Sequence, residues 1–196
     1  LPLLPGFSNM GSVTQGTRIN GHHLYASFGG AVSAAGDLNG DGYADVAVGA
    51  PTDDNFGNDA GMAFVFRGTA AGVDTATANL LWWESAGVPG ARFGERLAPA
   101  GDVNGDGRPD LLVGETSRVN LAQGAGGTLL IVQSLVHASS GSVVRTAGDV
   151  NGDGLSDVLV GDFNHSNGEA IEGRVLVYSG AADPPSLYAN WTLNQT

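Results

Sequence analysis

The clearest hydrophobic pattern in the chain is a run of three apolar residues closed by glycine, which occurs at residues 46–49, 111–114 and 158–161. Each run is apolar at consecutive positions, which is typical of a short strand buried on both faces. Another glycine follows twelve residues beyond each closing glycine and begins a further β-type run. These second runs cover residues 62–66, 127–132 and 174–178. The pattern therefore predicts an all-β protein built from repeated strand pairs.

An acidic phrase, D-x-N-x-D-G-x-x-D, comes directly before each of the three apolar runs. The copies occupy residues 37–45, 102–110 and 149–157. Nine residues before the first Asp of each copy stands a dipeptide that ends in glycine, namely Phe28-Gly29, Phe93-Gly94 and Ser140-Gly141. The shared spacing holds over about 45 residues per copy, which is the period of a propeller blade and too long for a solenoid with one strand per turn.

Each copy is expected to contain a short strand before the acidic loop, a strand after it and a third strand after a surface loop. Residues 79–84 suit a fourth, outer strand. The first two copies are 65 residues apart and the last two only 47. The missing residues fall where the fourth strand should lie, so the middle unit is expected to be three-stranded or irregular. Residues 12–20 and 189–193 are expected to form outer strands at the two ends.

The organisation predicted for residues 1–196 is a single β-propeller segment with blades at roughly 22–84, 85–135 and 136–196. Three blades cannot close a ring, because propellers typically have four to eight. The chain is therefore expected to be a fragment of a larger propeller, or to complete a ring by self-association. It does not begin with Met, and we expect a mature or excised piece of a longer protein.

The composition limits the kinds of partner that this protein is expected to bind. The formal net charge is −12, and nine of the 15 Asp residues lie in the three acidic phrases. A net negative charge argues against binding to nucleic acid or to an anionic membrane surface. The chain has no Cys, which excludes disulfides and thiolate zinc sites. No apolar run approaches membrane-spanning length, so we expect no membrane insertion.

The acidic phrases suit a hard cation that prefers oxygen ligands, above all Ca²⁺. Oxygen-bearing side chains stand at positions 1, 3, 5 and 9, a backbone carbonyl is available at position 7, and a glycine allows the bend at position 6. The sequence therefore predicts three Ca²⁺ sites, one in each copy of the phrase. Their predicted ligands are Asp37, Asn39, Asp41, the Tyr43 carbonyl and Asp45; Asp102, Asn104, Asp106, the Arg108 carbonyl and Asp110; and Asp149, Asn151, Asp153, the Leu155 carbonyl and Asp157.

Two other interpretations of the acidic phrases are an EF-hand and a simple turn. An EF-hand needs Glu at position 12, and this position holds Val48, Val113 or Val160. Asp-Asn-Gly strings can also be simple turns. Against that alternative, three carboxylates per loop repel one another unless a cation is present.

Other polar and aromatic residues point to a binding or catalytic role less clearly than the acidic phrases do. His22, His23, His137 and His165 are expected to be solvated or turn histidines. Residues 53–59 form a polar loop, with weak additional cation binding as the alternative. Trp82, Trp83, Tyr188 and Trp191 either pack between blades or present an aromatic surface to a sugar or a protein. No nucleophile, metalloprotease, phosphate-loop or dinucleotide motif is present, so no catalytic residue or organic cofactor is predicted.

With these residues in view, the chain resembles the FG-GAP (integrin alpha-type) β-propeller repeat family. The resemblance rests on Phe28-Gly29, on the loop at 37–45 and on Gly49-Ala50-Pro51, and it covers roughly residues 16–194. It implies a seven-bladed propeller with Ca²⁺ in loops on one face and with ligands bound elsewhere. Integrin ectodomains mediate adhesion, whereas other members are secreted enzymes or carbohydrate-associated proteins. This chain departs from the family in having three repeats and no Cys.

The function expected from the sequence is a non-enzymatic, extracellular or cell-surface propeller segment that serves adhesion or recognition. Ca²⁺ would be structural, and the ligand would be a protein or a carbohydrate that the sequence does not identify. Two alternatives stay open. The segment could belong to a secreted lyase or hydrolase whose catalytic residues lie outside this chain, or it could be a self-assembling blade module.

Overall fold

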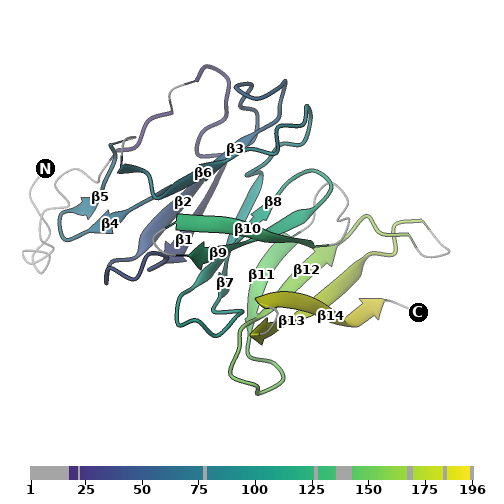
Figure 1. The fold of residues 1–196 in the computed structure, drawn as a ribbon. Coiled ribbons are helices and arrows are strands. Elements are labelled where there is room, and N and C mark those ends of the chain that lie inside the picture. The colour runs from purple at the N-terminus through teal and green to yellow at the C-terminus, as the bar shows by residue number, and fades with distance from the viewer. Residues whose placement is uncertain are drawn as a thin grey trace, which may run out of the picture.

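The computed structural model shows three four-stranded antiparallel sheets that follow one another along the chain (Figure 1). It describes residues 18–21, 23–76, 79–125, 128–135, 143–166, 170–182 and 185–194. These ranges contain no α-helix, and hence none long and apolar enough for a membrane span. The all-β class and the repeated blades predicted from the sequence are confirmed.

Each sheet is a blade in which neighbouring strands pair in order. The first blade consists of β1 (Ala31–Gly36), β2 (Asp45–Ala50), β3 (Met62–Phe66) and β6 (Trp82–Glu84), and a small ribbon of β4 (Gly68–Thr69) and β5 (Gly72–Val73) lies between β3 and β6 in the chain. The second consists of β7 (Arg96–Gly101), β8 (Asp110–Gly114), β9 (Val119–Ala125) and β10 (Thr128–Leu135). The third consists of β11 (Val143–Gly148), β12 (Asp157–Asp162), β13 (Arg174–Ala182) and β14 (Pro185–Asn194).

The apolar runs that end in glycine form the second strand of every blade, as predicted. In β8 every residue is buried, because the second blade lies between the other two. Successive side chains of a strand point to opposite faces, so Leu111 and Val113 join the cluster shared with the first blade. Leu112 joins the cluster shared with the third blade. The core is therefore two apolar layers, one at each junction between blades.

The middle blade was expected to be three-stranded or irregular, and it is instead a regular four-stranded sheet. Gly114 is followed by a tight turn in which the N–H of Glu115 donates to the carbonyl of Arg118 at 2.9 Å. The third strand therefore starts at Val119, earlier than the run aligned by Gly126. That run, predicted as the third strand, is β10 and forms the fourth strand of the blade. The second blade is shorter because the turn between β8 and β9 and the connection between β9 and β10 are both shorter than their counterparts in the first blade, and it has four strands like its neighbours.

Some of the outer strands predicted from the sequence are present in the structure and others are not. Residues 189–193 lie within β14 and residues 82–84 form β6, so both expected strands exist. Residues 18–20 contain no strand. Residues 12–17 lie outside the described residues, as do Ser140 and Gly141 of the third dipeptide.

Candidate functional site

The three acidic loops occupy the same place in each blade, between the first and second strands. A register shift at the end of the first strand accompanies each loop. Neighbouring loops also touch. The Arg108 side chain lies over Gly40, with Nε 3.4 Å from the place of a Cβ. Leu155 lies over Gly105 in the same way at 3.0 Å. The loops therefore form a continuous row along one edge of the blade array.

Oxygen atoms of loop positions 1, 3 and 5 gather around the loop backbone. In the first loop, the Asp41 N–H donates to Oδ1 of Asp37 at 2.9 Å and to Oδ1 of Asn39 at 2.8 Å. The Gly42 N–H donates to Oδ2 of Asp37 at 2.7 Å, and the Tyr43 N–H donates to Oδ1 of Asp41 at 3.0 Å. The corresponding bonds recur in the second and third loops. The sequence repeat therefore produces one loop conformation three times.

The glycines of the phrase make this conformation accessible. Gly42, Gly107 and Gly154 at position 6 have φ of 91°, 83° and 88°, a left-handed region in which other residues are strained. The glycines at position 4 are left-handed as well. The bend predicted at position 6 is confirmed.

The carboxylate at position 9 is a buried clamp. Asp45 is 1% exposed. Its Oδ2 accepts the Leu38 N–H at 3.0 Å and its Oδ1 accepts the Gly68 N–H at 2.9 Å. One side chain therefore ties the acidic loop to the residues that follow the third strand. The same two bonds are made by Asp110 with Val103 and Gly124, and by Asp157 with Val150 and Gly180.

Burial perturbs the pKa of Asp45 and of Asp110. Burial raises the pKa of Asp110 to about 7, and the negative charges of Asp106 and Asp102 add to the increase. Burial also raises the pKa of Asp45 above its usual value. In contrast, the N–H of Gly154 and other loop N–H groups lower the pKa of Asp149. A buried carboxylate that has two further carboxylates nearby is stabilised in its charged form by a cation.

The donor set of each loop is chemically suited to Ca²⁺. All predicted side-chain ligands carry oxygen, which Ca²⁺ prefers. In the described segments, no three His, Cys, Asp or Glu side chains are already arranged around a common metal position. The side chains of Asp37, Asn39 and Asp41 instead accept loop N–H groups. A carboxylate has about four lone-pair sites, so these oxygens can bind a cation and an N–H group together.

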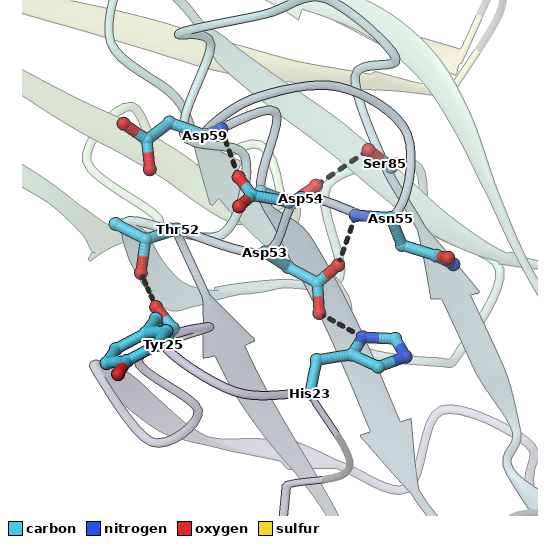
Figure 2. Close-up of polar contacts among 9 residues, drawn as sticks. His23, Tyr25, Thr52, Asp53, Asp54, Asn55, Asp59 and Ser85 are labelled. Atoms are coloured by element: carbon cyan, nitrogen blue, oxygen red, sulfur yellow. Dashed lines mark hydrogen bonds and ion pairs between the residues drawn. The ribbon is translucent and has the colours of Figure 1, made fainter.

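A second polar cluster lies in the loop between β2 and β3 (Figure 2). Asp53 is 2% exposed, and its Oδ2 is 2.6 Å from Nδ1 of His23. Its Oδ1 accepts the Asn55 N–H at 2.9 Å. Thr52 Oγ1 donates to the Tyr25 carbonyl at 2.6 Å. These contacts fasten the segment before β1 to the β2–β3 loop.

The His23–Asp53 pair was not predicted. The two residues are 30 positions apart, and neither stands in a recognisable motif. From the sequence, His23 is expected to be a solvated or turn histidine and residues 53–59 a polar loop. The structure shows that Asp53 is a buried member of this loop and that His23 is its partner.

The neighbouring tryptophans Trp82 and Trp83 have opposite environments. Trp82 is buried at the junction of the first two blades, with its ring 6.4 Å from that of Phe93. Trp83 is half exposed and stacks on Phe56 at 5.7 Å. It lines a cleft of about 290 Å³ together with Phe64 and His23. His22, His137 and the side chains of Tyr188 and Trp191 lie outside the part that the structure describes.

Two repeat families match separate parts of the chain. Residues 28–66 match the FG-GAP repeat, and residues 102–160 match the FG-GAP-like repeat. The first range contains the first acidic loop, and the second range contains the second and third loops.

Proteins of known identity that are similar to this chain include integrin alpha chains. The chain is 37% identical to integrin alpha-V of Gallus gallus over 101 residues, which is 50% of this chain. It is 38% identical to integrin alpha-5 of Xenopus laevis over 100 residues, or 49% of this chain. It is 33% identical to integrin alpha-X of Mus musculus over 135 residues, or 67% of this chain. These matches span 9%, 9% and 11% of the relatives' own lengths.

Proposed function

Because the chain belongs to the FG-GAP, integrin alpha-type repeat family, we propose that it is a Ca²⁺-stabilised propeller segment that serves adhesion or recognition outside the cell. The observation that carries this proposal is the threefold recurrence of one oxygen-rich loop whose closing Asp is buried beside two further carboxylates. The integrin alpha relatives support a role as a recognition scaffold, and we propose no catalytic activity.

Each Ca²⁺ would be held by the side chains at positions 1, 3, 5 and 9 and by the carbonyl at position 7. In the first loop these are Asp37, Asn39, Asp41, Asp45 and the carbonyl of Tyr43. The ion would supply positive charge where carboxylates repel one another. Two unit charges about 4 Å apart interact by roughly 4 kcal/mol at an effective dielectric constant of 20. Because the position-9 clamp also bonds to the third strand or to the residues just after it, this charge would stabilise the blade as well as the loop.

An extracellular location fits a loop of this kind. EF-hand sites in extracellular modules have dissociation constants of about 10⁻⁴–10⁻³ M for Ca²⁺, and the three acidic loops would bind Ca²⁺ in that range. Recognition would involve the loops and the exposed aromatic side chains, since binding residues are commonly found on loops held by a rigid scaffold.

Thermal unfolding with and without Ca²⁺ tests the structural role of the ion. Saturating Ca²⁺ is expected to raise the Tm by about 5–11 °C per site at 100 times the dissociation constant. Chelation should reverse the increase, and Mg²⁺ should replace Ca²⁺ poorly because it demands a smaller octahedral site. A Tm that is the same in Ca²⁺ and in chelator would contradict the proposal.

A pair of matched variants separates loop charge from general surface charge. Asp41→Asn keeps the oxygen that accepts the Tyr43 N–H but removes one negative charge from the first loop. Asp54→Asn removes a charge from the β2–β3 loop, where Asp54 accepts the Asp59 N–H. Asp41→Asn is expected to reduce the Ca²⁺-dependent increase in Tm, whereas Asp54→Asn should leave it unchanged.

Recognition is tested with glycan and protein arrays probed in Ca²⁺. Trp83→Ala is expected to weaken binding to any ligand that uses the exposed aromatic surface. Val88→Ala, at an exposed loop residue elsewhere, should have no effect. A folded, Ca²⁺-loaded protein that binds nothing on either array would count against a recognition role.

A further inference from the structure

The outer strand of the second blade has one edge open to pairing. β10 pairs with β9 on one side (Figure 1), and among the described residues no strand pairs with its other side. The free N–H and C=O groups of an edge strand can pair with another extended chain. The second blade has a neighbouring blade on each of its two faces, so this edge is distinct from the faces at the two ends of the array.

The sequence of β10 leaves this edge unprotected. Charged side chains or proline commonly block pairing at an edge, and β10, Thr-Leu-Leu-Ile-Val-Gln-Ser-Leu, contains neither. Leu130 is 55% exposed and Ile131 is 38% exposed. Because they are successive residues of a strand, they lie on opposite faces. A register shift follows Ile131, whereas residues 128–131 pair regularly with β9, so these four residues are the regular part of the open edge.

A groove beside Ile131 lies between the first two blades. This junction groove has a volume of about 350 Å³, and its apolar lining includes Ala86, Phe93 and Ile131. Leu129 is 2% exposed and belongs to the apolar cluster shared with the first blade. Ile131 lies two residues further along the strand and hence on the same face. In a strand paired with β10, a side chain on that face would therefore lie next to Ile131 and the junction groove.

The junction groove is richer in negative than in positive charge. Its described lining contains two carboxylates, those of Glu84 and Glu115, and one guanidinium, that of Arg118. Oε1 of Glu115 is 2.8 Å from Nε of Arg118, so these two charges are paired. Glu84 is exposed at the end of β6 and makes no ion pair with another described residue. The groove therefore offers one unpaired carboxylate to a positively charged group.

We propose that the open edge of β10 and the junction groove together bind an extended, basic segment of a protein partner. The segment would pair with residues 128–131, place an apolar side chain against Ile131 and place a Lys or Arg beside Glu84. Strand addition of this kind combines main-chain hydrogen bonds with pockets for alternate side chains. The inference rests on the recognition role proposed above and names the class of partner. It is independent of the Ca²⁺ sites, because no predicted Ca²⁺ ligand lies in β10 or lines the groove.

Charge favours a basic partner over a second copy of this chain. The formal net charge is −12, so two copies repel each other, whereas a segment rich in Lys or Arg is attracted by the same field. β10 also contains no basic residue that could meet Glu84 of another copy. Pairing between the open edges of two copies would therefore leave this carboxylate without a cation.

A phage-displayed library of random peptides tests the proposal on the 196-residue chain in Ca²⁺. The library is first passed over the double variant Glu84→Gln, Ile131→Thr, which removes peptides that bind elsewhere on the protein. It is then selected on the native chain. Enriched peptides are expected to alternate apolar with other residues and to carry Lys or Arg. A selection that enriches nothing, or that enriches acidic peptides, would overturn the proposal.

A synthetic peptide with the enriched sequence allows the contacts to be measured by isothermal titration calorimetry. Glu84→Gln and Ile131→Thr should each weaken its binding by about two- to tenfold, because one removes a charge pair and the other removes apolar area. Val32→Thr is the control, since Val32 is an exposed residue of β1 outside the groove. Circular dichroism checks that the variants fold. Equal affinities for the two groove variants and the native chain would contradict the assigned surface.

Methylation of the peptide backbone separates strand pairing from side-chain contact. In an extended peptide, alternate residues direct their N–H groups to opposite edges. Two isomers that are N-methylated at alternate residues, one along each edge, therefore keep the same side chains but block different edges. Strand addition predicts that one isomer loses affinity by at least about tenfold and that the other retains it. Equal effects of the two isomers would overturn the pairing with β10.

This inference and the proposed Ca²⁺ role fail under different results. A chain whose Tm does not respond to Ca²⁺ but that binds the peptide at Glu84 and Ile131 would contradict the Ca²⁺ role and support the docking site. A chain that Ca²⁺ stabilises and that binds an array ligand, but from which no groove-dependent peptide is selected, would overturn the docking site alone.

Discussion

The α-carbon of Gly49 lies directly against the carbonyl oxygen of Gly94: a Cβ at position 49 would be 2.0 Å from that oxygen. Gly94 itself has φ of 81°, and its own Cβ position is 2.4 Å from the Met62 carbonyl. The backbones of the first and second blades therefore touch without side chains between them. This contact gives a physical reason for two glycines of the repeat, the one after Phe93 and the one that closes the apolar run within β2.

Gly49→Ala is expected to destabilise the protein by about 1–3 kcal/mol or more, because the added methyl group forces the first two blades apart. Gly161→Ala is the matched control. Gly161 ends the corresponding run in β12, and its Cβ position is no closer than 3.9 Å to any neighbour outside its adjacent residues. Urea unfolding of both variants is the measurement, and equal losses in the two would show that the inter-blade contact is not the cause.

His23→Ala is expected to lower the free energy of unfolding by about 1–3 kcal/mol at neutral pH, because it removes the partner of a buried carboxylate. The same change should loosen residues 23–27, which can be followed by amide hydrogen exchange. His165→Ala, in the β12–β13 loop, serves as the control and should change stability little. A His23→Ala protein with unchanged stability and exchange would contradict a structural role for the pair.

The buried carboxyl group of Glu115 is expected to make the stability of the protein depend on pH. Burial raises its pKa above the ordinary 4.5, although Arg118 and Asn120 act in the opposite direction. Because the folded protein holds this proton more tightly than the unfolded chain does, the resulting stability is fully present below the ordinary pKa. It is lost as the pH rises through the higher value of the folded state.

Glu115→Gln removes this titration. The free energy of unfolding of the native protein minus that of the variant should therefore fall between about pH 4 and the raised pKa, and should be flat above it. Urea unfolding at several pH values measures this difference. A difference that increases with pH would mean that the pKa of Glu115 is lowered by its pair with Arg118.

The sequence was most informative where one spacing occurs three times. The acidic phrase placed the loops and located the strand after each loop, because Asp45, Asp110 and Asp157 all begin that strand. It also identified the left-handed glycines. The loop after the second strand has no such constraint. The four-residue turn from Glu115 to Arg118 therefore moved β9 and β10 relative to the predicted alignment.

Contacts between distant residues could not be derived from the chain alone. His23 and Asp53 carry no motif, and their pairing depends on how the segment before β1 crosses the first blade. Trp82 and Trp83 are adjacent and both apolar, so composition does not say which one faces the next blade. Strand alternation settles this in the structure: Trp82 is at the blade junction and Trp83 faces the cleft.

The stoichiometry of bound Ca²⁺ tests the central claim most directly. Equilibrium dialysis against millimolar Ca²⁺, followed by metal analysis, should find three ions per chain, and Asp41→Asn should reduce binding at one site alone. A chain that is folded and retains no Ca²⁺ at this concentration would contradict the account of the three acidic loops.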